Sequence, residues 1–153
     1  MTRAIASLFG AGFLRPAPGT WGSLAALVPG AAVLAWVGPI AVLAGAGLIA
    51  AAGWWAVAVE LARDGEEDPE WIVIDEAAGQ WLALAGLPGF GWVGVALAFA
   101  LFRLFDIAKP GPVGWADRRR GATGVMLDDL AAGALAALAL LLSRLLAPPG
   151  LLP

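Results

Sequence analysis

The sequence predicts an all-α integral membrane protein: one domain over residues 1–153, built as a helical bundle with some short or re-entrant helices. Hydrophobic residues make up 61% of the chain and charged residues only 14%, whereas soluble domains carry roughly 25% charged residues. The mean hydropathy is +0.84. So little charge cannot cover a soluble surface, and the charges are gathered into a few segments between long uncharged ones. We therefore expect most of the surface to face lipid.

The first uncharged segment predicts a helical hairpin. Residues 24–59 run for 36 positions without a formal charge, and Gly38 and Pro39 interrupt them. This break predicts two arms, over residues 23–37 and 40–59. The second arm has 20 residues, enough to cross a bilayer core of about 30 Å. The first arm is shorter, so we expect it to be tilted or only partly inserted.

An acidic segment follows, and then a second apolar one. Residues 60–76 contain eight acids and one base, a net charge of −7. The acids are Glu60, Asp64, Glu66, Glu67, Asp68, Glu70, Asp75 and Glu76. Residues 77–102 are again uncharged, and the stretch GLPGFG interrupts them at 86–91. This pattern favours two short helices or a re-entrant pair over one span.

The basic counterpart lies at residues 103–120, where five bases and two acids give a net charge of +3. Arg103, Asp106 and Lys109 are spaced i, i+3, i+6, so a helix that reaches Lys109 would carry them as one polar stripe. Two prolines, Pro110 and Pro112, are expected to end that helix. A last apolar helix is predicted from about residue 129 to residue 147.

If each apolar hairpin enters the membrane and returns, every charged loop lies on one face. The positive-inside rule makes that face cytoplasmic. A polar face with charges of both signs on an apolar bundle is the arrangement expected of a protein that acts on a lipid headgroup. The prediction is a membrane protein whose working site faces the cytoplasm.

The absence of two residue types limits the chemistry. The chain has no Cys and no His, which excludes cysteinyl-phosphate and phosphohistidine routes and the commonest general base. The stretch RPAPGTWGS lacks the spacing of a phosphate-binding Walker loop, so nucleotide binding is not expected. Carboxylates, Lys, Arg, hydroxyls and bound cations must carry any reaction.

Five acids stand at the borders of apolar segments and have two interpretations. They act as helix caps, or they supply oxygen ligands to Mg²⁺. Five acids bordering lipid, with no His or Cys beside them, favour the metal. Neighbouring helical residues diverge by about 100°, so ligands must come from several helices. The acids are Asp75, Glu76, Asp106, Asp128 and Asp129.

Glycines follow two of these acids at a helical spacing. Gly79 comes four residues after Asp75, and Gly133 four residues after Asp129. Each glycine therefore lies on the same helix face as its acid, and a missing side chain lets another helix approach. The spacing predicts tight helix crossings at both acidic pairs.

The basic and hydroxyl groups also have two interpretations each. Arg103 and Lys109 suit phosphate oxygens, or they form an internally paired stripe at the membrane interface. Arg118, in the stretch DRRRG, contacts a phosphate or attracts anionic lipid. Thr20 and Ser23 lie in a glycine-containing turn that offers amides to a phosphate, or they cap a helix; from the sequence the cap is favoured.

Three blocks of sequence, in order, resemble the bacterial phosphatidylglycerophosphatase A family. They are PAPGTWGSLAAL at 16–27, DPEWIVIDEAAG at 68–79 and FRLFDIAKPGPVGWADRRRGATGVMLDDLAAG at 102–133. The resemblance implies an all-α, Mg²⁺-dependent lipid phosphatase that converts phosphatidylglycerophosphate to phosphatidylglycerol and inorganic phosphate. The implied partner is a phospholipid in the bilayer, with no nucleic acid, and no oligomeric state is predicted.

Together these observations give a site hypothesis. Asp75, Glu76, Asp128 and Asp129, helped by Asp106, hold one or two Mg²⁺ ions, and Asp75 or Asp129 accepts the proton of the attacking water. Two bases, Arg103 and Lys109, clamp the phosphate, with Arg118 as a third candidate, while Thr20 and Ser23 line the headgroup pocket. The main alternative is a small transporter or cation-conducting bundle that uses the same acids. A headgroup transferase is a third, for which the D-G-x-x-A-R signature is missing.

Overall fold

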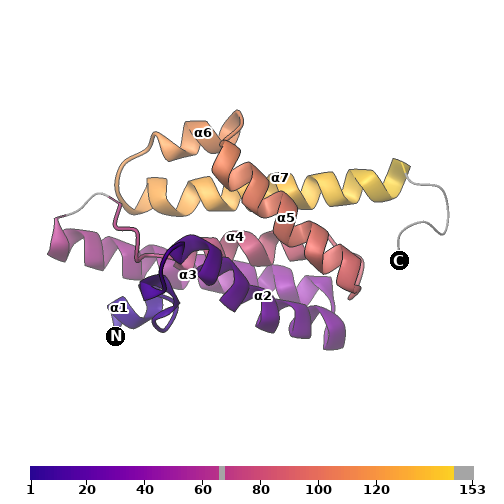
Figure 1. The fold of residues 1–153 in the computed structure, drawn as a ribbon, viewed down its shortest axis with the longest axis horizontal. Helices are drawn as coiled ribbons and strands as arrows, with labels where there is room; N and C mark the ends of the chain where they lie inside the picture. Colours follow the sequence, from indigo (N-terminus) through magenta and orange to yellow (C-terminus); the bar gives the residue numbers. More distant parts are fainter. Residues whose placement is uncertain (66–67, 147–153) are drawn as a thin grey trace.

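The computed structural model describes residues 1–65 and 68–146. Within them the chain forms seven α-helices and one 3₁₀ helix, η1, with no strand, which confirms the all-α prediction (Figure 1). The predicted acids Glu66 and Glu67 and the end of the last predicted helix fall outside the described residues. The elements are α1 (Thr2–Ala6), η1 (Ala11–Phe13), α2 (Pro18–Trp36), α3 (Pro39–Asp64), α4 (Ile74–Leu84), α5 (Trp92–Ala108), α6 (Pro112–Asp117) and α7 (Gly121–Leu146).

Three helices are long and apolar enough to cross a membrane: α2, α3 and α7, with 19, 26 and 26 residues. Large apolar side chains along them are exposed, among them Val28, Leu48 and Leu142. In a soluble protein such surfaces would have to be covered, whereas lipid solvates them. The protein is a membrane protein.

The shorter helix α4 lies at the centre of the bundle and contacts α2, α3, α5 and α7 (Figure 1). Nine of its eleven residues are buried, because Ala77, Ala78 and Gly79 let the surrounding helices approach closely. Trp81 packs where Gly30 of α2 and Gly45 of α3 leave room for its indole ring. The Trp81 Nε1 group also donates a hydrogen bond to the carbonyl of Ala26, at 2.9 Å.

The first helix of the predicted hairpin begins earlier than expected. The α2 helix starts at Pro18 rather than at residue 23, because proline suits the first turn of a helix. The predicted glycine turn before Ser23 is therefore wrong, and so is the favoured capping role of Thr20 and Ser23, because both lie inside α2 and its N-cap is Ala17. Its glycines serve packing instead, since a Cβ on Gly22 would lie 2.6 Å from the Cβ of Val73. With 19 residues, α2 is long enough to cross the bilayer core.

The last helix also begins earlier, at Gly121 rather than at residue 129. Its first turns already bury Val125 and Met126 against the core, which favours helix over loop there. As a result, Asp128 and Asp129 lie inside α7 and do not cap its start. The capping interpretation is wrong for this pair.

The helix that carries Arg103 ends one residue short of Lys109. The α5 helix stops at Ala108, and Lys109 adopts a left-handed backbone conformation with φ of 46°. The predicted stripe therefore does not include Lys109. A further helix, α6, was not predicted: Pro112 begins this helix instead of only ending the previous one.

The connections between the long helices lie at the two ends of the bundle (Figure 1). The connections from α3 to α4 and from α6 to α7 lie at one end of the bundle, and the tight α2–α3 turn and the start of α5 lie at the other. The first two connections belong to the acidic and basic segments. This arrangement places the charged loops together, as the hairpin prediction required.

Candidate metal and phosphate site

A polar cavity of about 600 Å³ opens at the charged end of the bundle. Its walls come from the start of α2, the first turn of α4, the end of α5, the α6–α7 connection and the second turn of α7. It brings together nine of the ten predicted site residues: Thr20, Asp75, Glu76, Arg103, Asp106, Lys109, Arg118, Asp128 and Asp129. The tenth, Ser23, is fully buried behind the wall.

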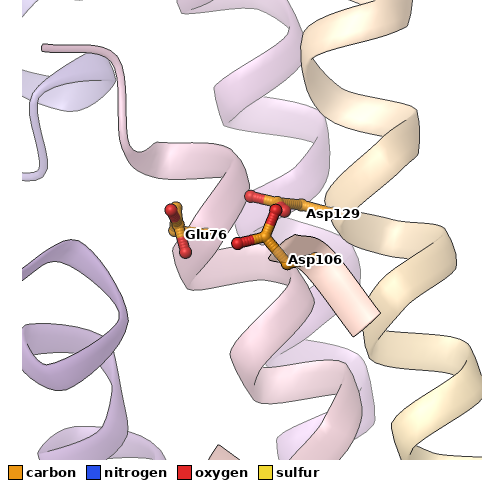
Figure 2. A group of neighbouring side chains, drawn as sticks. All are labelled: Glu76, Asp106 and Asp129. Atoms are coloured by element: carbon orange, nitrogen blue, oxygen red, sulfur yellow. The ribbon is translucent and has the colours of Figure 1, made fainter. Parts of the chain in front are cut away.

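Three of the acids converge on one point from three helices. Glu76 of α4, Asp106 of α5 and Asp129 of α7 each offer a carboxylate oxygen, and these oxygens lie within 4.8 Å of one another. Figure 2 shows the three side chains directed toward one another across the gap between their helices. Such an arrangement can hold one cation, because oxygen donors from separate elements surround a single position.

The neighbouring acids point elsewhere, as the divergence of adjacent helical residues requires. Asp75 accepts a hydrogen bond from the backbone N–H of Glu76 at 2.9 Å. Asp128 binds the Lys109 Nζ group, also at 2.9 Å. Both acids line the same cavity, so their part in binding a cation stays a prediction.

Arg103 lies among the converging carboxylates. Its Nη1 group is 2.5 Å from Glu76 Oε2 and 2.8 Å from Asp106 Oδ2. The hydroxyl of Ser23, on α2, donates to the same Glu76 oxygen at 2.5 Å. The chain at Gly19 passes so close to Glu76 that a Cβ would overlap its Oε1 atom. The backbone and side chains of α2 and α5 thus fix the Glu76 carboxylate from two sides.

Lys109 reaches the cavity by a different route from the one expected. Its left-handed backbone directs the chain away from the axis of α5, and its Nζ group pairs with Asp117 of α6 and Asp128 of α7. Asp117 was missed in the sequence; its one signal was its place directly before three arginines. The two ion pairs tie the loop that carries Arg118 to α7.

The surroundings of the acids shift their proton affinities. Burial, and then the charge of Glu76, raise the pKa of Asp75 well above its ordinary range. Burial also raises the pKa of Glu76, although Arg103 opposes this shift. Burial lowers the pKa of Lys109, but its hydrogen bonds to Asp117 and Asp128 outweigh this and raise the pKa overall. Without a further cation, the carboxylates of α4 are therefore costly to ionise.

The charge balance of the cavity leaves room for that cation. Eight acids and five bases line the cavity, which leaves three formal negative charges in excess. Asp75 and Asp129 have no ion pair among the residues the structure describes. Hard oxygen donors with surplus negative charge suit Mg²⁺, which usually takes one or two carboxylates plus waters and phosphate oxygens.

A further group of cations stands at the rim. Arg118, Arg119 and Arg120 all line the cavity. The Arg119 guanidinium lies 4.1 Å from the ring centre of Trp115, which fixes it against α6. These three arginines thus place positive charge on one side of the rim, where they can contact an anion that bridges to a bound cation.

Residues 4–144 match the family described as phosphatidylglycerophosphatase A. The chain belongs to the phosphatidylglycerophosphatase A family. The chain is therefore an enzyme of a phosphomonoesterase family, and this membership favours hydrolysis over the alternative of a non-enzymatic transporter.

Individual relatives agree with the family. The chain is 39% identical over 125 residues to a phosphatidylglycerophosphatase A of Haemophilus influenzae, covering 81% of this chain and 77% of the relative. It is 41% identical over 137 residues to a putative phosphatidylinositol-3-phosphatase of Bacteroides thetaiotaomicron, covering 82% of each. A phosphatidylglycerophosphatase A of Escherichia coli is 42% identical over 80 residues, 51% of this chain and 46% of the relative. No solved structure matches the chain.

Proposed function

We propose that the protein hydrolyses phosphatidylglycerophosphate to phosphatidylglycerol and inorganic phosphate with the help of Mg²⁺, at the cytoplasmic face of a bacterial inner membrane. One observation carries the proposal: the convergence of Glu76, Asp106 and Asp129 beneath a rim of arginines. A phosphomonoester needs both features, because its oxygens are stabilised by a cation on one side and by donors on the other.

The carboxylates of Glu76, Asp106 and Asp129 would hold the cation, with Asp75 and Asp128 beside them. A bound divalent cation lowers the pKa of the attacking water and offsets the negative charge of the phosphoryl oxygens. Asp75 or Asp129 accepts the proton of that water, since neither carboxylate is committed to a basic side chain. The phosphorus–oxygen bond to the glycerol then breaks, and the alkoxide leaves with a proton from solvent.

The basic groups bind the substrate in this proposal. Arg103 and Lys109 now form ion pairs with carboxylates of the cavity. A phosphate that enters the cavity can take the place of these carboxylates as the partner of each base. Arg118 stands at the rim and contacts the headgroup from outside. Thr20, in the first turn of α2, lines the same wall, while the buried Ser23 positions Glu76 rather than contacting the headgroup.

The test is phosphate release from short-chain phosphatidylglycerophosphate, with Mg²⁺ and with a chelator. We expect release only with the cation. Replacing Asp129 with Asn keeps the shape of the side chain but removes its negative charge and its basicity, and should lower the rate by at least about 100-fold. Folding of the variant is checked by thermal unfolding in detergent. Wild-type turnover by folded Asp129→Asn would remove this residue from the reaction.

The relative named as a putative phosphatidylinositol-3-phosphatase supplies a second substrate for the same assay. Both lipids carry a phosphomonoester on a polyol that a phosphodiester joins to diacylglycerol. Comparing kcat/KM for the two lipids under identical conditions decides which polyol the cavity prefers. Faster release from the inositol lipid would contradict the proposed substrate, although not the proposed chemistry.

A further inference from the structure

Gln80 is an anomaly in the packed centre of the bundle. Its side chain is 0% exposed, yet neither its Nε2 group nor its Oε1 atom has a hydrogen-bond partner. No other buried polar side chain among the described residues has such atoms. Unpartnered buried amides are costly and rare in proteins. A leucine or methionine of similar shape would remove the cost, so the amide needs a reason to be there.

The position of Gln80 connects it to the site. Gln80 lies four residues after Glu76 on α4, and residues at this spacing share a helix face. Side chains on a helix lean toward its N-terminus, so the side chain of Gln80 covers the turn that carries Glu76. The preceding residue, Gly79, is in contact distance of Asp129 and Phe102. This spacing places Gln80 on the Glu76 face of α4, one turn further along the helix, and Gln80 is not among the residues that line the cavity.

The hydrogen bonds of Glu76 suggest what the amide does. Ser23 and Arg103 both donate to Oε2 of Glu76. Under the proposed function, Arg103 turns to the phosphate and Glu76 turns to the cation. Glu76 then loses its second donor at the moment when its orientation matters most. Ligating carboxylates are normally held by a hydrogen bond from outside the metal shell.

Resting on the proposed function, we propose that Gln80 is a positioning residue of the cation site: its carboxamide N–H groups replace Arg103 as donors to the Glu76 carboxylate when cation and phosphate are bound. Without a cation, Arg103 satisfies Glu76 and the amide of Gln80 has no partner. With a cation, the amide holds Glu76 in place. The chain tolerates the unpaired amide because it is needed in the loaded state.

The role predicts opposite effects on stability and on cation binding. Replacing Gln80 with Leu removes the unpaired amide, so the cation-free protein should unfold at the same or a higher temperature. The same change removes the donor to Glu76, so the affinity for Mn²⁺, used as a spectroscopic probe in place of Mg²⁺, should fall by about 10- to 100-fold. A residue that served packing alone would lose stability and affinity together.

The experiment measures Mn²⁺ binding by electron paramagnetic resonance and unfolding by thermal scan, on the full chain in detergent without substrate. Gln80→Met is the second variant, which repeats the test with a more flexible side chain. Ser7→Ala is the matched control: Ser7 is buried and its hydroxyl is bonded to Gly10 and Ala4, away from the cavity. This control should lose stability and keep its Mn²⁺ affinity.

Two results would overturn the inference. Wild-type Mn²⁺ affinity in Gln80→Leu and Gln80→Met would show that the amide does not hold Glu76. Failure of both variants to fold, or a lower unfolding temperature in both, would show that the amide supports the resting structure. If the wild-type protein itself binds no Mn²⁺, the proposed function fails and this inference fails with it. If the wild type binds and the variants match it, only this inference fails.

Discussion

Gly79 of α4 and Gly133 of α7 lie backbone against backbone, so closely that a Cβ on Gly133 would overlap the carbonyl oxygen of Gly79 and come within 2.9 Å of its Cα. A Cβ on Gly79 would in turn lie 2.5 Å from the carbonyl oxygen of Asp129. Both clashes are with backbone, which cannot move aside as a side chain can. This crossing sets the separation of Glu76 and Asp129, which the two helices carry.

Replacing Gly133 with Ala should therefore push α4 and α7 apart. We expect a loss of stability of about 1–3 kcal/mol from overpacking and a loss of phosphatase activity larger than the stability loss explains, because the carboxylates separate. Gly47→Ala is the control, since a Cβ there meets nothing within 4 Å. It should be neutral or slightly stabilising, because alanine favours a helix. Wild-type activity in folded Gly133→Ala would argue against the crossing as the spacer of the site.

Replacing Arg103 with Gln should separate cation binding from turnover. The guanidinium is the basic partner of both Glu76 and Asp106. Without this positive charge, the site repels a metal ion less, so Mn²⁺ affinity should stay equal or rise. Turnover should fall by at least about 100-fold, because a donor to the phosphate is lost. Arg15→Gln removes an exposed ion pair with Glu70 and serves as control. Parallel loss of affinity and turnover in Arg103→Gln would contradict this assignment.

Cation affinity should increase with pH. The raised pKa values of Asp75 and Glu76 mean that each carboxyl keeps its proton at a pH where an ordinary carboxyl has lost it. A cation must displace these protons, so its affinity falls as the pH falls through the raised pKa values. Mn²⁺ titrations between about pH 5 and pH 8 test the sign. An affinity that stays constant over this range, or that drops at the higher pH, would be inconsistent with protonated ligands.

Replacing Thr2 with Val should lower stability without changing the rate of phosphate release. The Thr2 hydroxyl donates to Glu60, which is buried at 2% exposure, and this bond ties α1 to α3. Without this donor, the buried Glu60 carboxylate keeps its ion pair with Arg63 but loses a hydrogen bond. The free energy of unfolding should fall by about 1–3 kcal/mol. Thermal unfolding measures the loss, and kcat/KM for the folded fraction should match the wild type. A stable variant with reduced activity would assign α1 a part in the site.

Much of the architecture could be predicted from the distribution of charge. The uncharged segments and their breaks at Gly38 and at residues 86–91 mark the helices that the structure contains. Helix starts were less predictable, because Gly19, Gly22 and Gly124 resemble turn residues in sequence. In the structure they are helical and accept close neighbours: Glu76, Val73 and the backbone of Arg119. Local sequence does not reveal whether a glycine bends the chain or admits a partner.

The candidate site, like the fold, was predictable only in part. The acids and bases were predictable as a set, because ionisable residues beside lipid are costly and have few roles. Their partners were not, since Ser23 with Glu76 and Lys109 with Asp117 depend on how helices cross. Lys109 is a particular case: its left-handed backbone ends α5, and the ion pairs of its Nζ group with Asp117 and Asp128 could not be read from the spacing of the sequence.

The tight turn between α2 and α3 has a consequence for how the protein enters its membrane. Neither Val37 nor Gly38 carries an ionisable group, and α3 holds no charge before Glu60. A charge at the centre of a spanning helix costs about 2.5–3.5 kcal/mol on insertion. The hairpin tip can therefore enter the bilayer as one unit with no charge to desolvate, while the charged segments that build the cavity lie at the opposite end of the bundle.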